Sequence, residues 1–375
     1  MKITEIEAFP LNLPMKQNFT ISGGSVGDQQ KGAPHVYIKI TTDDRSQGWG
    51  EARPSNRWSY ETIESVVSTI NHYFKPILLG QNAEDIKNVH KLMNSEIKNG
   101  LTIGQPIAKA GIDTALHDLI GKHQKKTISE LWFSKPKRSI GLSYLISTRN
   151  IQEAVQKANY AFENGYQGID LKIGFSAGED LGMVEAVKEA APDLFFRVDA
   201  NQGYTLSEAV KVSKGLEKLG VDVFEQPLKA NDLLGHAELR RKTYVPIALD
   251  ESIWTAGDLI QAIRLEACDT AVIKITKMGG LSGAKLCGEI AREANLDLLG
   301  GGLTESTLGL TASAHLFNYL GIDRPVDLNG PMFLEDDPVG EGPTIDEGNV
   351  LLNNNLHGIG CSIDTQKINR FRVEL

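Results

Sequence analysis

The sequence predicts an α/β fold, a (β/α)8-type barrel with an α+β capping domain built from the N-terminal region and the C-terminal tail. Five short apolar runs in the middle of the chain each end in a charged residue, namely Lys172, Asp199, Glu225, Asp250 and Lys274. The intervals between these residues are 27, 26, 25 and 24 positions, about the length of one strand, one helix and two loops. At 375 residues the chain also exceeds the ~250 of such a barrel, so we expect a second domain.

The first 130 residues have the pattern of an antiparallel, turn-rich module followed by helices. Lys2–Phe9 and His35–Thr41 alternate between apolar and polar side chains, as half-buried strands do, and Gly48-Trp49-Gly50 then marks a break. We assign residues 1–130 to the capping domain. Helical spacing follows in three segments: Glu61–Tyr73, Ala83–Lys98 and Ile107–Lys122.

From Ile140 onward the pattern alternates between strands and helices, and we assign residues 131–330 to the barrel. Residues 331–375 are loop-rich and are expected to return to the capping domain. In a barrel of this type the C-terminal ends of the strands converge on one mouth, so the five charged residues should meet there. Eight strands are expected: Ile140–Ile146, Gly168–Lys172, Leu194–Asp199, Val221–Glu225, Ile247–Asp250, Ala271–Lys274, Leu296–Gly300 and Pro325–Leu328.

Composition argues against several classes of partner. The formal net charge is −9 and no run of lysine or arginine occurs, so neither nucleic acid nor an anionic membrane surface is expected. The three cysteines lie far apart and indicate neither a disulfide framework nor a zinc site. The N-terminal segment lacks the pattern of a secretory signal, and no apolar run approaches the ~18 residues of a membrane span. We expect a cytoplasmic protein.

The three acids at the strand ends predict a site for a divalent cation. Any one of Asp199, Glu225 or Asp250 alone could be a helix cap or a solvated loop charge. A carboxylate at the end of a buried strand is costly to desolvate, however, and three on adjacent strands repel one another without a cation. Oxygen ligands without nearby histidine or cysteine favour Mg²⁺, with Mn²⁺ as the alternative.

The two lysines flank these acids in strand order, and this arrangement predicts proton transfer. Lys172 lies one strand before the first acid and Lys274 one strand after the last, so their ammonium groups should lie on opposite sides of the metal. A metal-bound carboxylate substrate would have an acidified α-proton and a stabilised enediolate. Lysine serves as a base only when burial or a neighbouring positive charge lowers its pKa.

These residues resemble the enolase superfamily, specifically its muconate-lactonizing-enzyme subgroup, whose members include dipeptide epimerases and muconate cycloisomerases. The resemblance covers essentially the whole chain, from Met1-Lys2-Ile3 through the GWGEA segment Gly48–Ala52 to Gly330-Pro331. It implies a magnesium-dependent isomerase that acts on a small carboxylate as a symmetric homo-oligomer. The general chemistry of such sites is a lysine or histidine base with magnesium that stabilises an enediolate.

The resemblance also assigns roles to residues. Asp199, Glu225 and Asp250 correspond to the metal ligands, Lys172 to the second lysine of the KxK motif and Lys274 to the opposed lysine of strand six.

Two neighbouring positions correspond to residues that support the site in this family. Glu251 is similar to the glutamate that orients the strand-six lysine, and Asn201 lies near the first ligand.

One departure concerns the KxK motif, which is Asp170-Leu171-Lys172 in this chain. Asp170 lies on the same strand face as Lys172 and would raise its pKa, whereas a lysine would lower it. Lys172 would then be a poorer base and a better acid or electrostatic partner. Alternatively, Asp170 is neutralised by a local partner such as Lys211 or Arg197.

Substrate contacts are suggested by three further segments. Asp327-Leu328-Asn329 resembles the DxD motif with which dipeptide epimerases bind a substrate ammonium group, although its second acid is an asparagine. The segment Gly302–Ser306 resembles the loop that binds the substrate carboxylate, with Glu305 and Ser306 as contacts. The loop Ser22–Gly24 and the segment Arg53–Trp58 correspond to the part of the cap that closes over the substrate, with Arg53 as a contact.

Three functions remain open. The first is a racemase or epimerase of an amino-acid derivative or dipeptide, favoured by the opposed lysines and Asp327. The second is a cycloisomerase or a β-eliminating dehydratase that uses one lysine, favoured by Asp170. The third is a non-catalytic metal-binding protein, which the loss of a ligand would have favoured. None of the three ligands is lost.

Overall fold

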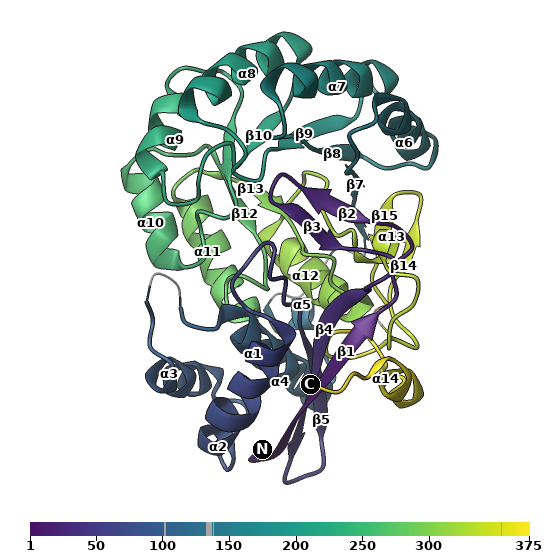
Figure 1. Cartoon of the computed structure of the whole chain (residues 1–375). Coiled ribbons are helices and arrows are strands. Elements are labelled where there is room, and N and C mark those ends of the chain that lie inside the picture. Colours follow the sequence, from purple (N-terminus) through teal and green to yellow (C-terminus); the bar gives the residue numbers. More distant parts are fainter. Residues whose placement is uncertain (101–102, 133–136, 138, 354) are drawn as a thin grey trace.

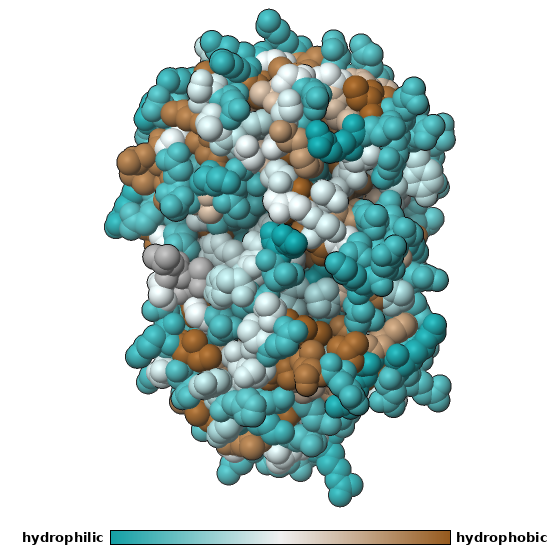
Figure 2. Space-filling view, in the orientation of Figure 1, coloured by the Kyte–Doolittle hydropathy of each residue, from teal (hydrophilic) through white to brown (hydrophobic). Residues whose placement is uncertain are grey.

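The computed structural model of the chain describes residues 1–100, 103–132, 137, 139–353 and 355–375. It contains a curled parallel sheet surrounded by helices and a smaller antiparallel sheet with its own helices (Figure 1). The first forms the barrel and the second forms the cap, so the predicted architecture is confirmed. On the face seen in Figure 2, hydrophilic residues predominate and hydrophobic residues occur in small groups, several of them over the cap.

The parallel sheet brings the predicted strand ends side by side. Its register pairs Lys172 with Asp199 and Asp199 with Glu225, while Glu225 pairs with Ala248, two residues before Asp250. Within the described residues the sheet has seven strands in sequence order: β7 (Ser143–Ile146), β8 (Gly168–Lys172), β9 (Phe195–Asp199), β10 (Val223–Glu225), β11 (Ile247–Leu249), β12 (Thr270–Ile273) and β13 (Asp297–Gly300).

The barrel is closed by a single bridging residue where a full eighth strand was expected. Val326 donates to Gly141 O over 2.9 Å and accepts from Ser143 N over 2.9 Å, and Asp327 N donates to Gly300 O over 3.0 Å. The segment therefore joins β13 to β7, but it forms only an isolated bridge. Proline 325 has no N–H for a longer ladder.

The expected first strand is also divided. Its beginning, β6 (Ser139–Gly141), pairs antiparallel with β15 (Asn349–Leu351), and only β7 belongs to the barrel.

Helices cover the outside of the barrel (Figure 1). Their starts follow from local sequence, because Thr205 and Thr255 each form a capping box with an acid three residues later. The helices are α6 (Ile151–Glu163), α7 (Ala177–Ala190), α8 (Leu206–Leu219), α9 (Leu233–Arg240), α10 (Ala256–Arg264), α11 (Leu281–Glu293) and α12 (Thr307–Leu320).

The cap packs its sheet against one long helix, α4 (Pro106–Gln124). A Cβ atom on Gly50 would lie 2.1 Å from Gly111 O, and one on Gly48 would lie 2.2 Å from Ala115 O, so the GWGEA glycines allow close approach. The other cap elements are β1 (Ile3–Leu13), β4 (Ala33–Thr42), β5 (Gln47–Ala52), α1 (Ile63–Ser68), the π-helical η1 (Thr69–Phe74), α2 (Lys75–Leu78), α3 (Ile86–Glu96) and α5 (Ile128–Trp132).

Two peripheral segments complete the fold. The hairpin of β2 (Phe19–Ile21) and β3 (Gly24–Gly27) lies between the cap sheet and the barrel (Figure 1). In the C-terminal segment, Leu334 bridges Met15 and Arg372 bridges Leu11. Among the described residues, no helix is both long and apolar enough to cross a membrane. The remaining elements are α13 (Gly330–Phe333), β14 (Thr344–Asp346) and α14 (Thr365–Phe371).

Candidate active site

Lys172 lies at the end of β8 between two carboxylates. Its Nζ donates to Asp199 Oδ2 over 2.8 Å and to Asp170 Oδ2 over 3.0 Å. Burial alone would lower the pKa of Lys172, but Asp170 and then Asp199 outweigh it, and the pKa lies well above its ordinary value. The effect of Asp170 on Lys172 thus has the direction that the sequence predicted.

Lys274, directly after β12, occupies the opposite side of the acids. Its Nζ donates to Asp250 Oδ2 over 2.6 Å and lies 5.0 Å from the centre of the Trp58 ring. Burial would lower the pKa of Lys274, but Asp250 and Glu225 outweigh burial and raise it. In sheet order, three strands separate β12 from β8.

Arg197 on β9 is the cation that neutralises Asp170. Its Nη2 donates to Asp170 Oδ2 over 2.7 Å and lies 3.4 Å from Asp327 Oδ2, while Nη1 lies 3.3 Å from Glu225 Oε2. Of the two partners considered for Asp170 from the sequence, Arg197 is the one found. Burial opposes the ionisation of Asp170, but Arg197 and Lys172 outweigh burial and lower its pKa to about 2.

The three acids assigned to the metal lie at adjacent strand ends but are paired with other side chains. Among the described residues, no three His, Cys, Asp or Glu side chains are grouped so as to hold an ion. Two buried oxygens are nevertheless suited to a cation: Glu225 Oε2, which accepts no hydrogen bond, and Asp250 Oδ1, which has only the Lys277 ammonium as its partner among the described residues. Their nearest charges are ion pairs, Arg197 at 3.3 Å and Lys277 at 2.8 Å respectively. The donor set fits a hard divalent cation in its chemistry.

Glu251 and Asn201 lie directly behind the acids. Asn201 N donates to Asp199 Oδ1 over 2.8 Å, and its Nδ2 donates to Glu251 Oε1 over 3.2 Å. Burial, followed by Asp250 and Asp199, raises the pKa of Glu251 to about 8. The structure thus places both residues beside the three acids, as the sequence placed them.

A small cavity at the barrel mouth brings both lysines together. Lys172, Lys274, Asn201 and Asp327 line it from the barrel. Burial, followed by Asp170, raises the pKa of Asp327 to about 7. From the cap, the apolar wall consists of Phe19, Ile21, Val26 and Trp58.

The β2–β3 hairpin is the lid of this cavity. Ser22 Oγ donates to Ala200 O over 2.9 Å and to Asn201 O over 2.8 Å, which joins the tip of the hairpin to the end of β9.

Ser306 and Arg53, expected as substrate contacts, lie elsewhere. The Ser306 side chain is fully buried, donates to Glu51 Oε2 over 2.5 Å and lies 2.5 Å from Tyr37 Oη. Arg53 is buried in the cap and donates to the carbonyls of Pro34 and Pro54. Neither side chain lines the mouth cavity.

Glu305 also has protein partners. Its carboxylate accepts from Thr276 Oγ1 over 2.6 Å and from Leu303 N over 2.6 Å. Of the substrate contacts proposed from the sequence, Asp327 is therefore the one that lines the cavity.

Sequence reasoning missed Lys277. The resemblance did place the loop Ser22–Gly24 and the segment Arg53–Trp58 over the substrate, and the hairpin tip and Trp58 lie at the mouth cavity. Lys277 is fully buried and lies 2.8 Å from Asp250 Oδ1. Little in the sequence indicated this contact, since Lys277 follows Lys274 by three residues in a loop. Arg197 had a clearer signal, because it precedes Asp199 by two positions and so shares its strand face.

Comparisons with known proteins identify the family of this chain. Residues 4–132 match the mandelate racemase / muconate lactonizing enzyme N-terminal domain, and residues 153–367 match the enolase C-terminal domain-like family. An N-succinyl-L-Arg/Lys racemase from Bacillus cereus is 32% identical over 334 residues, 88% of each chain. A muconate cycloisomerase from Acinetobacter lwoffii is 30% identical over 99% of this chain and 96% of its own.

Solved structures give the same picture. The crystal structure of the Bacillus cereus N-succinyl Arg/Lys racemase superimposes with a TM-score of 0.93 at 30% identity, covering 100% of this chain and 99% of the other. A dipeptide epimerase from Enterococcus faecalis, complexed with Mg and the dipeptide L-Leu-L-Tyr, superimposes with a TM-score of 0.89 at 27% identity, covering 96% and 100%. These relatives are racemases, epimerases and cycloisomerases, all of them isomerases.

Proposed function

The chain belongs to the mandelate racemase/muconate lactonizing enzyme family of the enolase superfamily, and on that premise we propose that this isomerase racemises or epimerises an amino-acid derivative or dipeptide. One observation carries the proposal. Lys172 and Lys274 line the same small cavity from β8 and from the end of β12, with the acids of β9, β10 and β11 between them. Two amines that face one substrate carbon from opposite sides can exchange its proton in either direction.

In the proposed step, one lysine accepts the α-proton as a neutral amine and the other donates a proton from its ammonium group to the opposite face. The roles reverse for the other enantiomer, so the atoms balance in both directions. Asp199, Glu225 and Asp250 would hold a Mg²⁺ ion, whose charge would acidify the α-proton and offset the acids that raise the lysine pKa values.

Asp327 supports a substrate with an α-amino substituent. It lines the cavity, and its carboxylate has no closer cation than Arg197 at 3.4 Å among the described residues. A substrate ammonium group would pair with it and favour its ionised form, which burial opposes.

The test is proton exchange followed by NMR in D2O with Mg²⁺. The substrates are L- and D-dipeptides, N-succinyl amino acids and muconate-type acids. A racemase loses the α-proton signal from both enantiomers without a new product. Lys172→Ala and Lys274→Ala should each abolish exchange from one enantiomer, while Lys211→Ala, an exposed lysine on α8, should leave both rates unchanged. Normal exchange in both active-site variants would overturn the assignment.

The second candidate is a cycloisomerase or dehydratase that uses one lysine. Asp170 favours it, because it holds Lys172 in the ammonium form through a 3.0 Å hydrogen bond. Such an enzyme would give new product resonances, and one lysine variant would be far more damaged than the other.

A further inference from the structure

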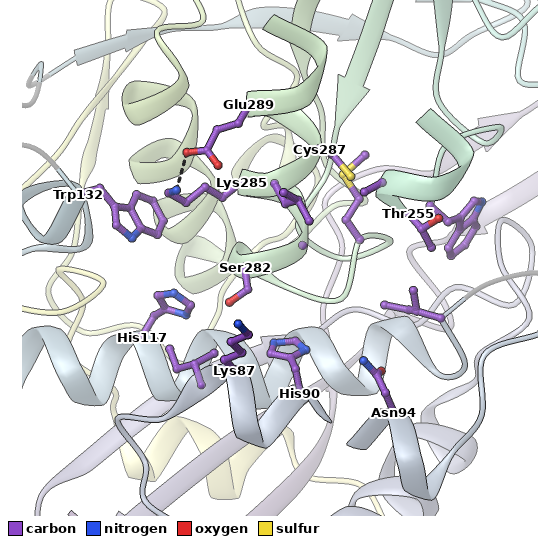
Figure 3. Close-up of a pocket in the computed structure, with 17 residues that line it drawn as sticks. Lys87, His90, Asn94, His117, Trp132, Thr255, Ser282, Lys285, Cys287 and Glu289 are labelled. Carbon is purple, nitrogen blue, oxygen red and sulfur yellow. Dashed lines mark hydrogen bonds and ion pairs between the residues drawn. The ribbon is translucent and has the colours of Figure 1, made fainter. Parts of the chain in front are cut away.

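We infer that a cleft between the cap and the barrel, separate from the mouth, binds a small organic anion with an apolar or aromatic body. The inference concerns different residues from those of the proposed function and does not depend on it. The cleft lies between α3 and α4 on the cap side and α11 on the barrel side (Figure 3). Its volume is about 640 Å³, within the range of small-molecule sites.

The walls of the cleft are largely apolar. Trp132, Trp254, Ile103, Met278 and Leu286 line it, and Figure 3 shows Trp132 at one side of the cleft. Leu286 is 49% exposed, because it faces this cleft rather than a packed core. A flat or branched apolar group would bury this surface.

The floor of the cleft carries two histidines fixed by one buried acid. Asp113 Oδ1 lies 2.6 Å from His90 Nε2 and accepts from Ser282 Oγ over 2.5 Å, and Asp113 Oδ2 lies 3.4 Å from His117 Nδ1. These contacts leave His90 Nδ1 and His117 Nε2 without a hydrogen bond to any described residue. Burial would lower the pKa of His117, but Asp113 outweighs burial and raises it, which favours the imidazolium form.

The charges that face the cleft leave a cation unpaired. Lys87 on α3 lines it and forms no ion pair or hydrogen bond with a described residue. Glu289 is already paired, since it accepts from Lys285 Nζ and from Tyr319 Oη, each over 2.5 Å. Asp113 is likewise engaged by its partners. An anion would thus find an available lysine and the Nε2–H donor of a His117 imidazolium, whereas a cation would find no free carboxylate among the described residues that line the cleft.

Two indole rings in contact, tilted by 32° to one another, lie between the cleft and the mouth. Trp254 lines the cleft and Trp58 lines the mouth, with 5.4 Å between their ring centres. Trp254 Nε1 also donates to Glu251 O over 2.8 Å. A ligand in the cleft would therefore contact a side chain that packs against the active site, and its binding should change tryptophan fluorescence.

The test compares phenylacetate with its neutral isostere phenylacetamide, by titration calorimetry and tryptophan fluorescence on the full chain. Phenylacetate should bind about tenfold more tightly than the amide, because the amide lacks the charge that strengthens hydrogen bonds. Lys87→Met should remove most of that preference. Lys91→Met, an exposed lysine on the same helix, is the matched control and should bind as the wild type does.

A second variant distinguishes the cleft from the mouth. Leu286→Trp fills the cleft from an exposed position, so the protein should fold normally and lose phenylacetate binding. Equal affinity for acid and amide, wild-type binding by Lys87→Met, or wild-type binding by Leu286→Trp would each overturn the inference. Dissociation of an oligomer by Leu286→Trp, seen by size-exclusion chromatography, would also overturn it, because the cleft would then be an interface between copies of the chain.

Discussion

Arg197 donates to Asp170 across the β8–β9 pair over 2.7 Å, so the position where a lysine was expected by resemblance holds an acid that a neighbouring arginine neutralises. Arg197 also lies 3.3 Å from Glu225 and 3.4 Å from Asp327. It therefore supplies positive charge to acids on β8, on β10 and on the segment that bridges β13 and β7. The KxK motif would place a second cation on β8, whereas in this chain the cation is Arg197 on β9. Asp170 is therefore not an isolated charge.

Removing this arginine should destabilise the barrel strongly. Arg197→Met leaves buried acids without their cation, and loss of one partner of a buried ion pair typically costs about 3–5 kcal/mol. The free energy of unfolding from urea denaturation should fall by that amount. The double variant with Asp170→Asn should recover at least ~1 kcal/mol, since it removes one buried acid and so lowers the repulsion among the acids that lose Arg197.

A surface ion pair provides the control. Arg240 Nε lies 2.7 Å from Asp269 Oδ1, but the two side chains are 35% and 32% exposed. Arg240→Met should therefore cost no more than ~1 kcal/mol. Equal losses for Arg197→Met and Arg240→Met would mean that the buried network is not a stabilising element.

The sequence could predict those parts of the fold that depend on periodicity. The 27-to-24 residue intervals placed the charged strand ends in register, and the observed pairs Lys172 with Asp199 and Asp199 with Glu225 confirm that. The predicted length of the eighth strand was wrong, because Pro325 has no N–H to donate to a ladder of hydrogen bonds.

Contacts between distant segments could not be predicted in the same way. Ser306 was expected at the substrate, but its partner Glu51 is 255 residues away in the chain. The lid of the mouth likewise depends on Ser22 meeting Ala200 and Asn201. No local pattern encodes such pairs, because they follow from how the cap docks on the barrel.

Magnesium should stabilise the wild-type chain through Glu225. Burial raises the pKa of Glu225 well above its ordinary value, and the negative charges of Asp199 and Asp250 raise it further. Arg197 lowers this pKa but does not outweigh burial. A bound cation would relieve this repulsion, and at 100 times its Kd it would add about 2.7 kcal/mol. Thermal melts with excess Mg²⁺ should then show a Tm roughly 3 °C higher.

Glu225→Gln tests that expectation. Without divalent cations the variant should be at least as stable as the wild type, because it removes one of several mutually repelling buried acids. With Mg²⁺ its Tm should not rise. The exposed Glu185→Gln on α7 should respond to Mg²⁺ as the wild type does. A Mg²⁺-dependent Tm rise in Glu225→Gln would remove Glu225 from the proposed ligand set.

Glu51 should make stability fall between about pH 4.5 and 7. Its carboxylate accepts from Ser306 N over 2.9 Å and from Gly309 N over 2.8 Å, which joins cap to barrel. Burial outweighs these bonds and raises the pKa of Glu51 from 4.5 to about 7. The folded state therefore keeps a proton that the unfolded state releases in this range, so rising pH favours unfolding by up to about 3 kcal/mol.

The measurement is urea denaturation at a series of pH values. Across that window, the free energy of unfolding of Glu51→Gln should change less with pH than that of the wild type. The difference between the two proteins should reach its full size above pH 7. Glu61, whose pKa burial also raises to about 7, should contribute separately, so the double variant with Glu61→Gln should change still less with pH. A constant offset between Glu51→Gln and wild type would show that Glu51 is ionised throughout the window.

Gly50 should tolerate no side chain, because α4 lies directly against β5. A Cβ atom there would come within 2.1 Å of Gly111 O and 2.6 Å of Ala115 N, both of them backbone atoms of a buried helix. We expect Gly50→Ala to lower the free energy of unfolding by at least ~3 kcal/mol, since the helix must shift as a whole.

Gly182→Ala inside α7 is the matched control. A Cβ atom there meets nothing within 4 Å, and alanine in a helix interior should stabilise by about 0.5–1 kcal/mol. Similar stabilities for the two variants in urea would show that β5 and α4 do not pack this closely.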